Sequence, residues 1–125
     1  MSTRENKMKA LYEYAEQASD KSNRYFMLEM PSDLASFVEE DLMCDMVGRV
    51  SEAGYEMEYS TQACAGSVDL YNEDGGHCGE GDYGEEVEML RGLLLEEKSY
   101  EEIVEEIATW WVDFARDNEE LDEED

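Results

Sequence analysis

The residues best suited to chemistry are one histidine and three cysteines. His77 and Cys78 are adjacent, and Cys44 and Cys64 stand apart from them. A Cys–His pair acts as nucleophile and base only when both side chains are held in a fixed geometry, which neighbours in a flexible loop seldom are. The four residues also follow no zinc-site spacing, since the chain has no CxxC pair. We therefore assign no catalytic residue and no metal site, and we expect no cofactor.

Glycines and acidic residues alternate around His77 and Cys78, but they fit no loop that binds calcium or phosphate. With Gly75 at the turn position of an EF-hand loop, the first and last ligands would be Leu70 and Gly81, which carry no carboxylate. Gly79, Gly81 and Gly84 are spaced somewhat like a phosphate-binding loop, but Glu80 would repel the phosphate. Paired carboxylates carry no information about catalysis in a chain with 35 Asp and Glu residues. An enzyme is therefore not expected.

The net charge is the strongest feature, at −26 for 125 residues. It opposes binding to nucleic acid or to an anionic membrane, so any charged partner must be basic. Leu, Ile, Val and Phe are few, but eight Met, eight Tyr and two Trp supply a core. No apolar run suits a membrane span or a signal peptide, and three cysteines without disulfide spacing fit a reducing compartment. We expect a cytoplasmic protein.

Apolar residues at helical intervals predict a mainly α fold of about four helices. These helices are expected over residues 3–19, over residues 32–53 with Gly54 as the stop, over residues 85–97, and from Ser99 onward. The last helix places Trp110 and Trp111 on its apolar side, where both are expected to anchor the core.

The middle of the chain shows a different pattern. Residues 55–59 and 68–72 alternate apolar and polar side chains, which predicts a short two-stranded antiparallel ribbon. Residues 74–84 combine glycines with acids and are expected to form a mobile loop. We expect a single compact acidic helical domain over residues 1–116, followed by an acidic tail over residues 117–125.

The acids recur at intervals of one, three and four, which places carboxylates about every 6 Å along a helix face. Solubility requires a net charge of only about 2 to 8. Carboxylates 6 Å apart repel by about 0.7 kcal/mol per pair even in water, so a charge this large indicates a function. Duplex DNA carries one charge per about 1.7 Å of axis, so 26 net charges match about 44 Å of duplex.

These numbers favour a DNA mimic, in which carboxylates replace phosphates in the basic groove of a DNA-binding protein. The alternative is an acidic adaptor or chaperone-like module that binds a basic DNA-binding protein without copying the shape of DNA. The acids expected to contact the partner are Glu39, Glu40, Asp41, Asp45, Glu52, Glu56, Glu58, Glu85, Glu86, Glu101, Glu102, Glu105, Glu106, Asp113 and Asp117.

The segment DMVGRVSEAGYEMEY, residues 45–59, resembles a stretch of the Ocr family of phage anti-restriction proteins. The shared features are an acid followed by two apolar residues, a glycine turn, and the alternation at residues 55–59. The resemblance implies a mostly helical DNA mimic that acts in the host bacterial cytoplasm. It implies a homodimer that occupies the DNA site of type I restriction-modification enzymes, with Val47, Val50 and Ser51 near the dimer interface.

Overall fold

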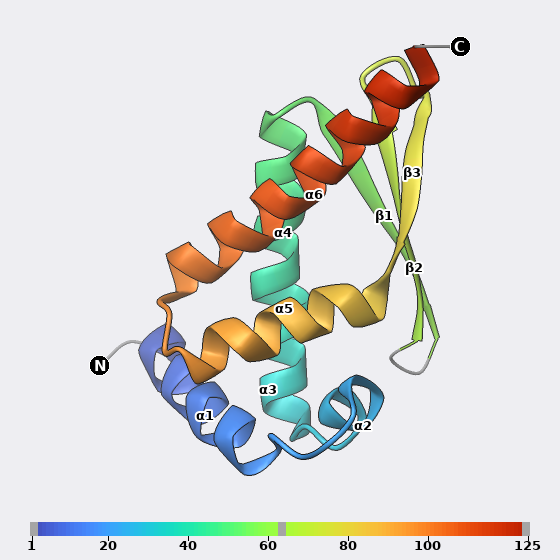
Figure 1. Ribbon diagram of the computed structural model, residues 1–125. Helices are drawn as coiled ribbons and strands as arrows, with labels where there is room; N and C mark the ends of the chain where they lie inside the picture. Colours follow the sequence, from blue (N-terminus) through green and yellow to red (C-terminus); the bar gives the residue numbers. More distant parts are fainter. Residues whose placement is uncertain (1–2, 63–64, 124–125) are drawn as a thin grey trace.

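A long helical rod runs through the middle of the computed structural model, which describes residues 3–62 and 65–123 (Figure 1). Helix α3 (Ser32–Phe37), a π-helical turn η1 (Val38–Leu42) and helix α4 (Met43–Glu52) follow one another without a break. This confirms the helix expected over residues 32–53, apart from the π turn, which holds one more residue than a regular turn. The rod buries one apolar stripe, formed by Leu34, Phe37, Val38, Leu42, Met43, Met46 and Val50.

A three-stranded antiparallel sheet follows the rod. Its strands β1 (Tyr55–Gln62), β2 (Ala65–Asn72) and β3 (His77–Asp82) are arranged in the order of the chain. Met57 lies opposite Leu70 across the first pair of strands, and both are buried. Successive residues of a strand point to opposite faces, so the alternation in the sequence gives one apolar and one acidic face. The predicted ribbon is thus confirmed and forms two thirds of a larger sheet.

Strand β3 corrects the mobile loop expected over residues 74–84. Gly81 pairs with Val68 of β2. A Cβ atom at Gly81 would lie 2.5 Å from the ring of Trp111, and one at Gly79 would lie 3.1 Å from the ring of Phe114. Strand glycines often mark such close approaches. The glycines therefore let aromatic rings pack directly on the strand.

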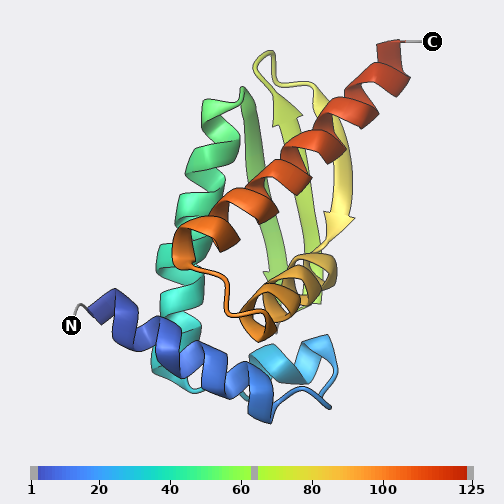
Figure 2. The ribbon, with the colours of Figure 1, turned by 60° about the vertical axis from the view of Figure 1, so that its left-hand side comes forward.

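Helices α5 (Tyr83–Leu95) and α6 (Tyr100–Glu123) cover the apolar face of the sheet, and α4 packs along β1 (Figures 1 and 2). The helices predicted over residues 85–97 and from Ser99 are confirmed. The hydroxyl of Ser99 accepts a hydrogen bond from the backbone N–H of Glu102 at 3.2 Å, which caps α6. Helix α6 continues to Glu123, so the boundary drawn at residue 117 is one of composition and not of secondary structure.

Two further helices close the end of the molecule opposite the tip of α6. Helix α1 (Thr3–Gln17) confirms the first predicted helix, while the short α2 (Asn23–Leu28) was not predicted. Arg91 of α5 binds this end, donating to the side chain of Asn23 at 2.8 Å and to the carbonyl oxygen of Ala18 at 3.1 Å. Within the described residues, no helix is long and apolar enough to cross a membrane.

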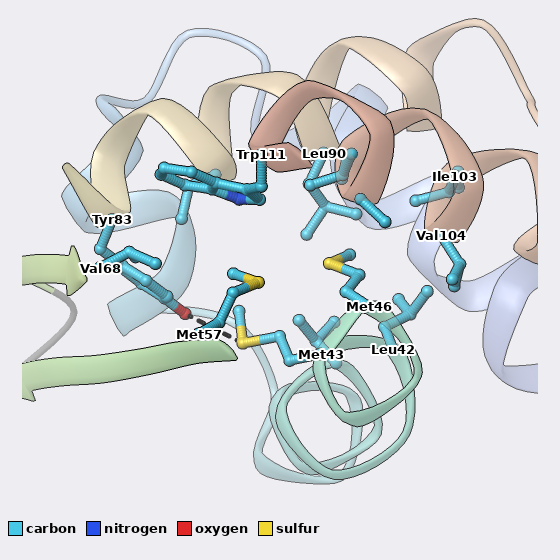
Figure 3. Packing of buried hydrophobic residues seen from close by; sticks show 14 of the residues in the cluster. Leu42, Met43, Met46, Met57, Val68, Tyr83, Leu90, Ile103, Val104 and Trp111 are labelled. Atoms are coloured by element: carbon cyan, nitrogen blue, oxygen red, sulfur yellow. Dashed lines mark hydrogen bonds between the residues drawn. The ribbon is translucent and has the colours of Figure 1, made fainter. Parts of the chain in front are cut away.

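The core lies between the rod, the sheet and the two long helices. Met43, Met46 and Met57 fill the space between the elements, with Leu90 and Trp111 across from them (Figure 3). Trp111 is fully buried, but Trp110 is 37% exposed, which corrects the expectation that both tryptophans anchor the core. Consecutive helical residues point about 100° apart, so only one of the two indoles can face the sheet.

We expect Gly81→Val to destabilise the protein by about 2 kcal/mol, because the added side chain must displace the Trp111 ring. Urea unfolding followed by tryptophan fluorescence measures the change. Gly84→Ala is the matched control, since a Cβ atom at Gly84 would meet nothing within 4 Å. Equal stability of the native protein and Gly81→Val would contradict the packing described for β3.

Candidate acidic binding surface

The acids predicted to contact a partner are exposed, with one exception. Glu86 is only 1% exposed and is the one charged side chain buried within the described part of the chain. The other predicted acids, on the rod, on β1, at the start of α5 and on α6, all lie at the surface. The first 24 residues carry five basic and four acidic residues, so the negative charge belongs to the rest of the molecule.

Helix α6 carries more acidic residues than any other helix of the described residues. Between Tyr100 and Glu123 it carries ten acidic residues and one basic residue. Twenty-four helical residues span about 36 Å, which gives one net negative charge per about 4 Å. A single strand of B-DNA carries one charge per about 3.4 Å of axis. The helix therefore matches the linear charge density of one DNA strand.

A shallow groove of about 410 Å³ separates α6 from α4. Glu52 lines it from α4, and Glu105 and Asp113 line it from α6. Arg49 and Arg116 also line this groove, and Arg116 lies 3.6 Å from the carboxylate of Asp113. Acids of both helices thus border the groove, and one arginine on each side partly neutralises them.

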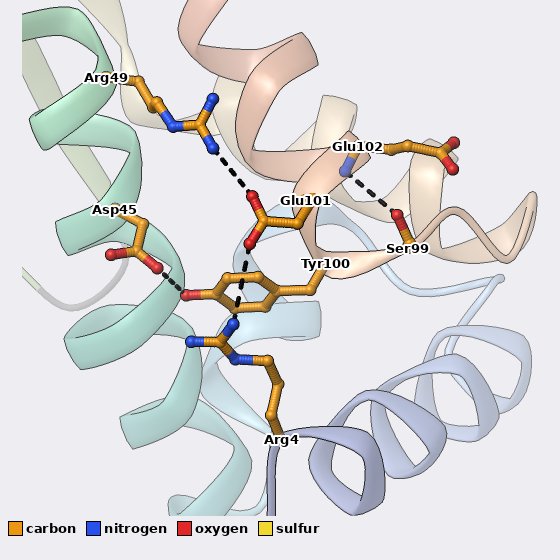
Figure 4. Close-up of polar contacts among 7 residues, drawn as sticks. All are labelled: Arg4, Asp45, Arg49, Ser99, Tyr100, Glu101 and Glu102. Carbon is orange, nitrogen blue, oxygen red and sulfur yellow. Dashed lines mark hydrogen bonds and ion pairs between the residues drawn. The ribbon is translucent and has the colours of Figure 1, made fainter. Parts of the chain in front are cut away.

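Two of the predicted acids are already engaged at the start of α6 (Figure 4). Glu101 binds Arg49 at 2.8 Å and Arg4 at 3.8 Å. Asp45 accepts a hydrogen bond from the hydroxyl of Tyr100, whose ring lies 4.0 Å from the Arg4 guanidinium. Burial and this hydrogen bond raise the pKa of the Tyr100 phenol. Asp45 and Glu101 therefore connect the rod to α1 and α6 and are less available to a partner than their neighbours.

The outer face of the sheet carries a second group of acids, of which the sequence predicted only part. Glu58 lies opposite Asp69, and Asp69 lies opposite Glu80. Adjacent strands are about 4.8 Å apart, so the three carboxylates form a row across the sheet. Asp69 and Glu80 were missed because their position depends on the pairing of β3, for which the local sequence gives no signal.

His77 and Cys78 lie on opposite faces of β3, as consecutive strand residues do. The His77 ring is exposed and its Nε2 atom lies 3.0 Å from the carboxylate of Asp69. Cys78 is buried, and its thiol contacts the carbonyl oxygen of Gly76 at 3.4 Å. Cys64 lies outside the described residues, within which no three His, Cys, Asp or Glu side chains are grouped as for a metal ion.

The implied dimer face requires one correction. Val50 is fully buried in the core and has no surface to offer a second copy. Val47 is half-buried and Ser51 is exposed. Cys44 and Gly48 lie on the same side of α4 at helical spacing, so this side is an uncharged stripe of small residues.

Glu86 is a buried acid and not a surface contact. Its Oε1 atom accepts a hydrogen bond from the hydroxyl of Tyr59 at 2.7 Å, and its Oε2 atom has no partner. Burial raises the pKa of Glu86 to about 7, while Tyr59 and the nearby Trp111 indole oppose the rise. Burial and the Glu86 carboxylate in turn raise the pKa of the Tyr59 phenol. The first turn of α5 thus places one acid inward and leaves Glu85 outside.

No protein-family model, curated protein or solved structure matches the chain.

We expect Glu86→Gln to remove one component of the pH dependence of stability. The folded state holds the Glu86 proton more tightly than the unfolded state does, so this residue stabilises fully below about pH 4.5 and loses its contribution as the pH rises through about 7. As the pH rises from about 4.5 to about 7, the free energy of unfolding of the variant, measured relative to that of the native protein, should increase by on the order of 3 kcal/mol. Urea unfolding across this pH range measures it.

Glu85→Gln is the control, because it removes the same charge from an exposed neighbour. Its stability relative to the native protein should stay nearly constant over that pH range. Parallel curves for Glu86→Gln and the native protein would rule out a buried, protonated Glu86.

Proposed function

We propose that this protein is a DNA mimic that occupies the DNA-binding groove of a type I restriction-modification enzyme in the bacterial cytoplasm. It acts by binding and not as an enzyme. The observation that carries the proposal is the charge density of α6, which matches that of one DNA strand over about 36 Å. Across the shallow groove, α4 contributes one further exposed acid, Glu52.

Binding would follow the physics of protein–DNA association. When a basic groove binds DNA, it displaces the cations that are condensed on the phosphates, and exposed carboxylates would exchange their own cations for the basic side chains in the same way. The near-neutral end formed by α1 and α2 adds little to this attraction. The exposed acids of α6 would therefore steer the encounter and orient the molecule in the DNA-binding groove of the partner.

The uncharged stripe on α4 supports the second part of the proposal, a homodimer. Two chains of like charge repel each other, so a contact between copies requires a face without carboxylates. The stripe of Cys44, Val47, Gly48 and Ser51 has no carboxylate of its own, and Glu39 lies at its edge beside Cys44 and Val47. A Cβ atom at Gly48 would meet nothing within 4 Å, so the fold itself does not require a glycine there. Pairing through this stripe would double the length of the acidic surface.

The alternative function, an acidic adaptor for a basic DNA-binding protein, is favoured by one observation. The indole of Trp110 is 37% exposed on a surface otherwise dominated by acids. A DNA backbone has no apolar counterpart to it. Competition with DNA separates the two functions, because an adaptor without DNA shape need not occupy the DNA site.

We expect duplex DNA to compete with this protein for a purified type I restriction enzyme, and the affinity to fall steeply as salt rises. The triple variant Glu105→Gln, Asp113→Asn, Asp117→Asn should bind more weakly and with a shallower dependence on salt. Inhibition of plasmid cleavage and fluorescence anisotropy of labelled protein measure these effects.

The control for the triple variant is Glu13→Gln, Glu16→Gln, Asp20→Asn. It removes the same charge from exposed positions at the near-neutral end. It should inhibit almost as well as the native protein. Equal losses in the two triple variants would mean that total charge matters and its placement on α6 does not. Binding that persists under saturating duplex DNA would reject the mimic in favour of the adaptor.

We expect Gly48→Glu to convert a dimer into a monomer, because it places a carboxylate and its bulk at the centre of the uncharged stripe. Light scattering coupled to size exclusion measures the molar mass. Gly84→Glu is the control, since it adds the same side chain at another helical glycine whose Cβ atom would be free of contacts. A native protein that is monomeric at every concentration would remove the dimer from the proposal.

A further inference from the structure

An apolar groove lies between α5 and α6, away from the α4–α6 groove. The two helices diverge from their short connection (Figure 1). The groove has a volume of about 360 Å³. The groove has an apolar lining of Met89 and Leu93 from α5 and Ile107 and Trp110 from α6, and Gly92 of α5 also lines it.

Trp110 is held as a rigid wall of this groove. Its ring stacks on Phe114 with 5.7 Å between ring centroids and 11° between ring planes. It also meets the edge of Trp111 at 4.8 Å and 86°. An aromatic side chain that is fixed in place loses little entropy on binding, and exposed tryptophans are common among the residues that dominate protein interfaces.

Gly92 keeps the groove open at a cost to the helix. It lies within α5, where glycine is less stable than alanine. A Cβ atom there would meet nothing within 4 Å, so no contact inside the molecule requires the glycine. Because Gly92 has no side chain, it leaves space in the groove that Trp110 also lines.

The charges around the groove indicate what occupies it. Glu96 of α5 and Glu106 of α6 line it together with the apolar residues, and no basic residue does. A second copy joined symmetrically through this groove would bring the same two carboxylates against their equivalents. A basic segment with an apolar side chain satisfies both the apolar walls and the acids.

We propose that the α5–α6 groove binds an amphipathic basic helix of the partner protein and that an apolar side chain of this helix packs against Trp110 above Gly92. This inference rests on the proposed function only for the basic character of the partner. It adds a contact that DNA cannot make, so the protein would hold its target by apolar packing as well as by charge. The apolar part of the affinity is insensitive to salt, unlike the part that comes from the acids.

The test uses a labelled leucine–lysine peptide with helical amphipathic spacing, and the same peptide with alanine in place of every leucine. The two peptides carry equal charge and differ only in the apolar anchor. We expect the leucine peptide to bind the full-length protein about tenfold more tightly by fluorescence anisotropy, as the loss of an interface anchor typically costs. That ratio should persist across a series of salt concentrations, while both affinities fall.

The variant Gly92→Leu fills the groove, and Gly92→Ala adds only a Cβ atom. Gly92→Leu and Trp110→Ala should abolish the preference for the leucine peptide without changing the dependence on salt, and Gly92→Ala should retain it. Circular dichroism verifies that each variant is folded. Equal binding of the two peptides by the native protein, or a preference that survives in both Gly92→Leu and Trp110→Ala, would overturn the proposal.

Two further results separate this proposal from binding of a second copy and from failure of the proposed function. If Gly92→Leu instead lowers the molar mass of the native protein in light scattering, the groove binds a second copy and the proposal is wrong. The peptides require no restriction enzyme, so a protein that fails to compete with DNA but prefers the leucine peptide loses the proposed function and keeps this site.

Discussion

The cost of burying a carboxylate governs this structure. An ionised carboxylate loses several kcal/mol of hydration in a protein interior, so 35 acidic residues must nearly all remain in water. Each helix therefore has one narrow apolar stripe, and few residues are available to fill the core. Large side chains meet this shortage, as the flexible Met43, Met46 and Met57 and the bulky Trp111 occupy the space between sheet and helices. Glu86 departs from the rule and holds its proton more tightly as a result.

The few basic residues strengthen the end of the molecule where the helices meet. Lys7 binds Asp33 at 2.9 Å, Arg49 binds Glu101 at 2.8 Å, and Arg91 connects α5 to the segment between α1 and α2. These contacts lie away from the distal half of α6. The repulsion among the acids is thus relieved mainly at this end, and further along α6 Arg116 lies 3.6 Å from the carboxylate of Asp113.

Local patterns predicted the elements whose burial depends on their own sequence. The helices at residues 3–19 and 32–53, the two long helices near the C-terminus and the alternation of residues 55–59 all follow from apolar spacing. Strand β3 did not, because its glycines are explained by the rings of Trp111 and Phe114, which lie about thirty residues further along the chain. Asp69 and Glu80 were missed for the same reason.

The sequence predicted that the acids of the candidate surface are exposed, but it did not predict which residues depart from this pattern. Exposure of the acids on the helices follows from their charge. The burial of Glu86 and the exposure of Trp110 depend on the angle of each side chain around its helix axis, which changes by about 100° from one residue to the next. The engagement of Asp45 and Glu101 depends on how three helices converge, which no local pattern encodes.

The π turn at Val38–Leu42 has a consequence for how the length of this chain can change. A wide turn accommodates one residue more than a regular helix would, without altering the phase of the residues on either side. Loss of one residue between positions 38 and 42 would leave a continuous α-helix whose two halves keep their present faces. In α3, the same deletion would rotate α4 by about 100° and move Cys44, Val47 and Ser51 into the buried places of Met43, Met46 and Val50. This turn is therefore the position in the rod that best tolerates the deletion of one residue.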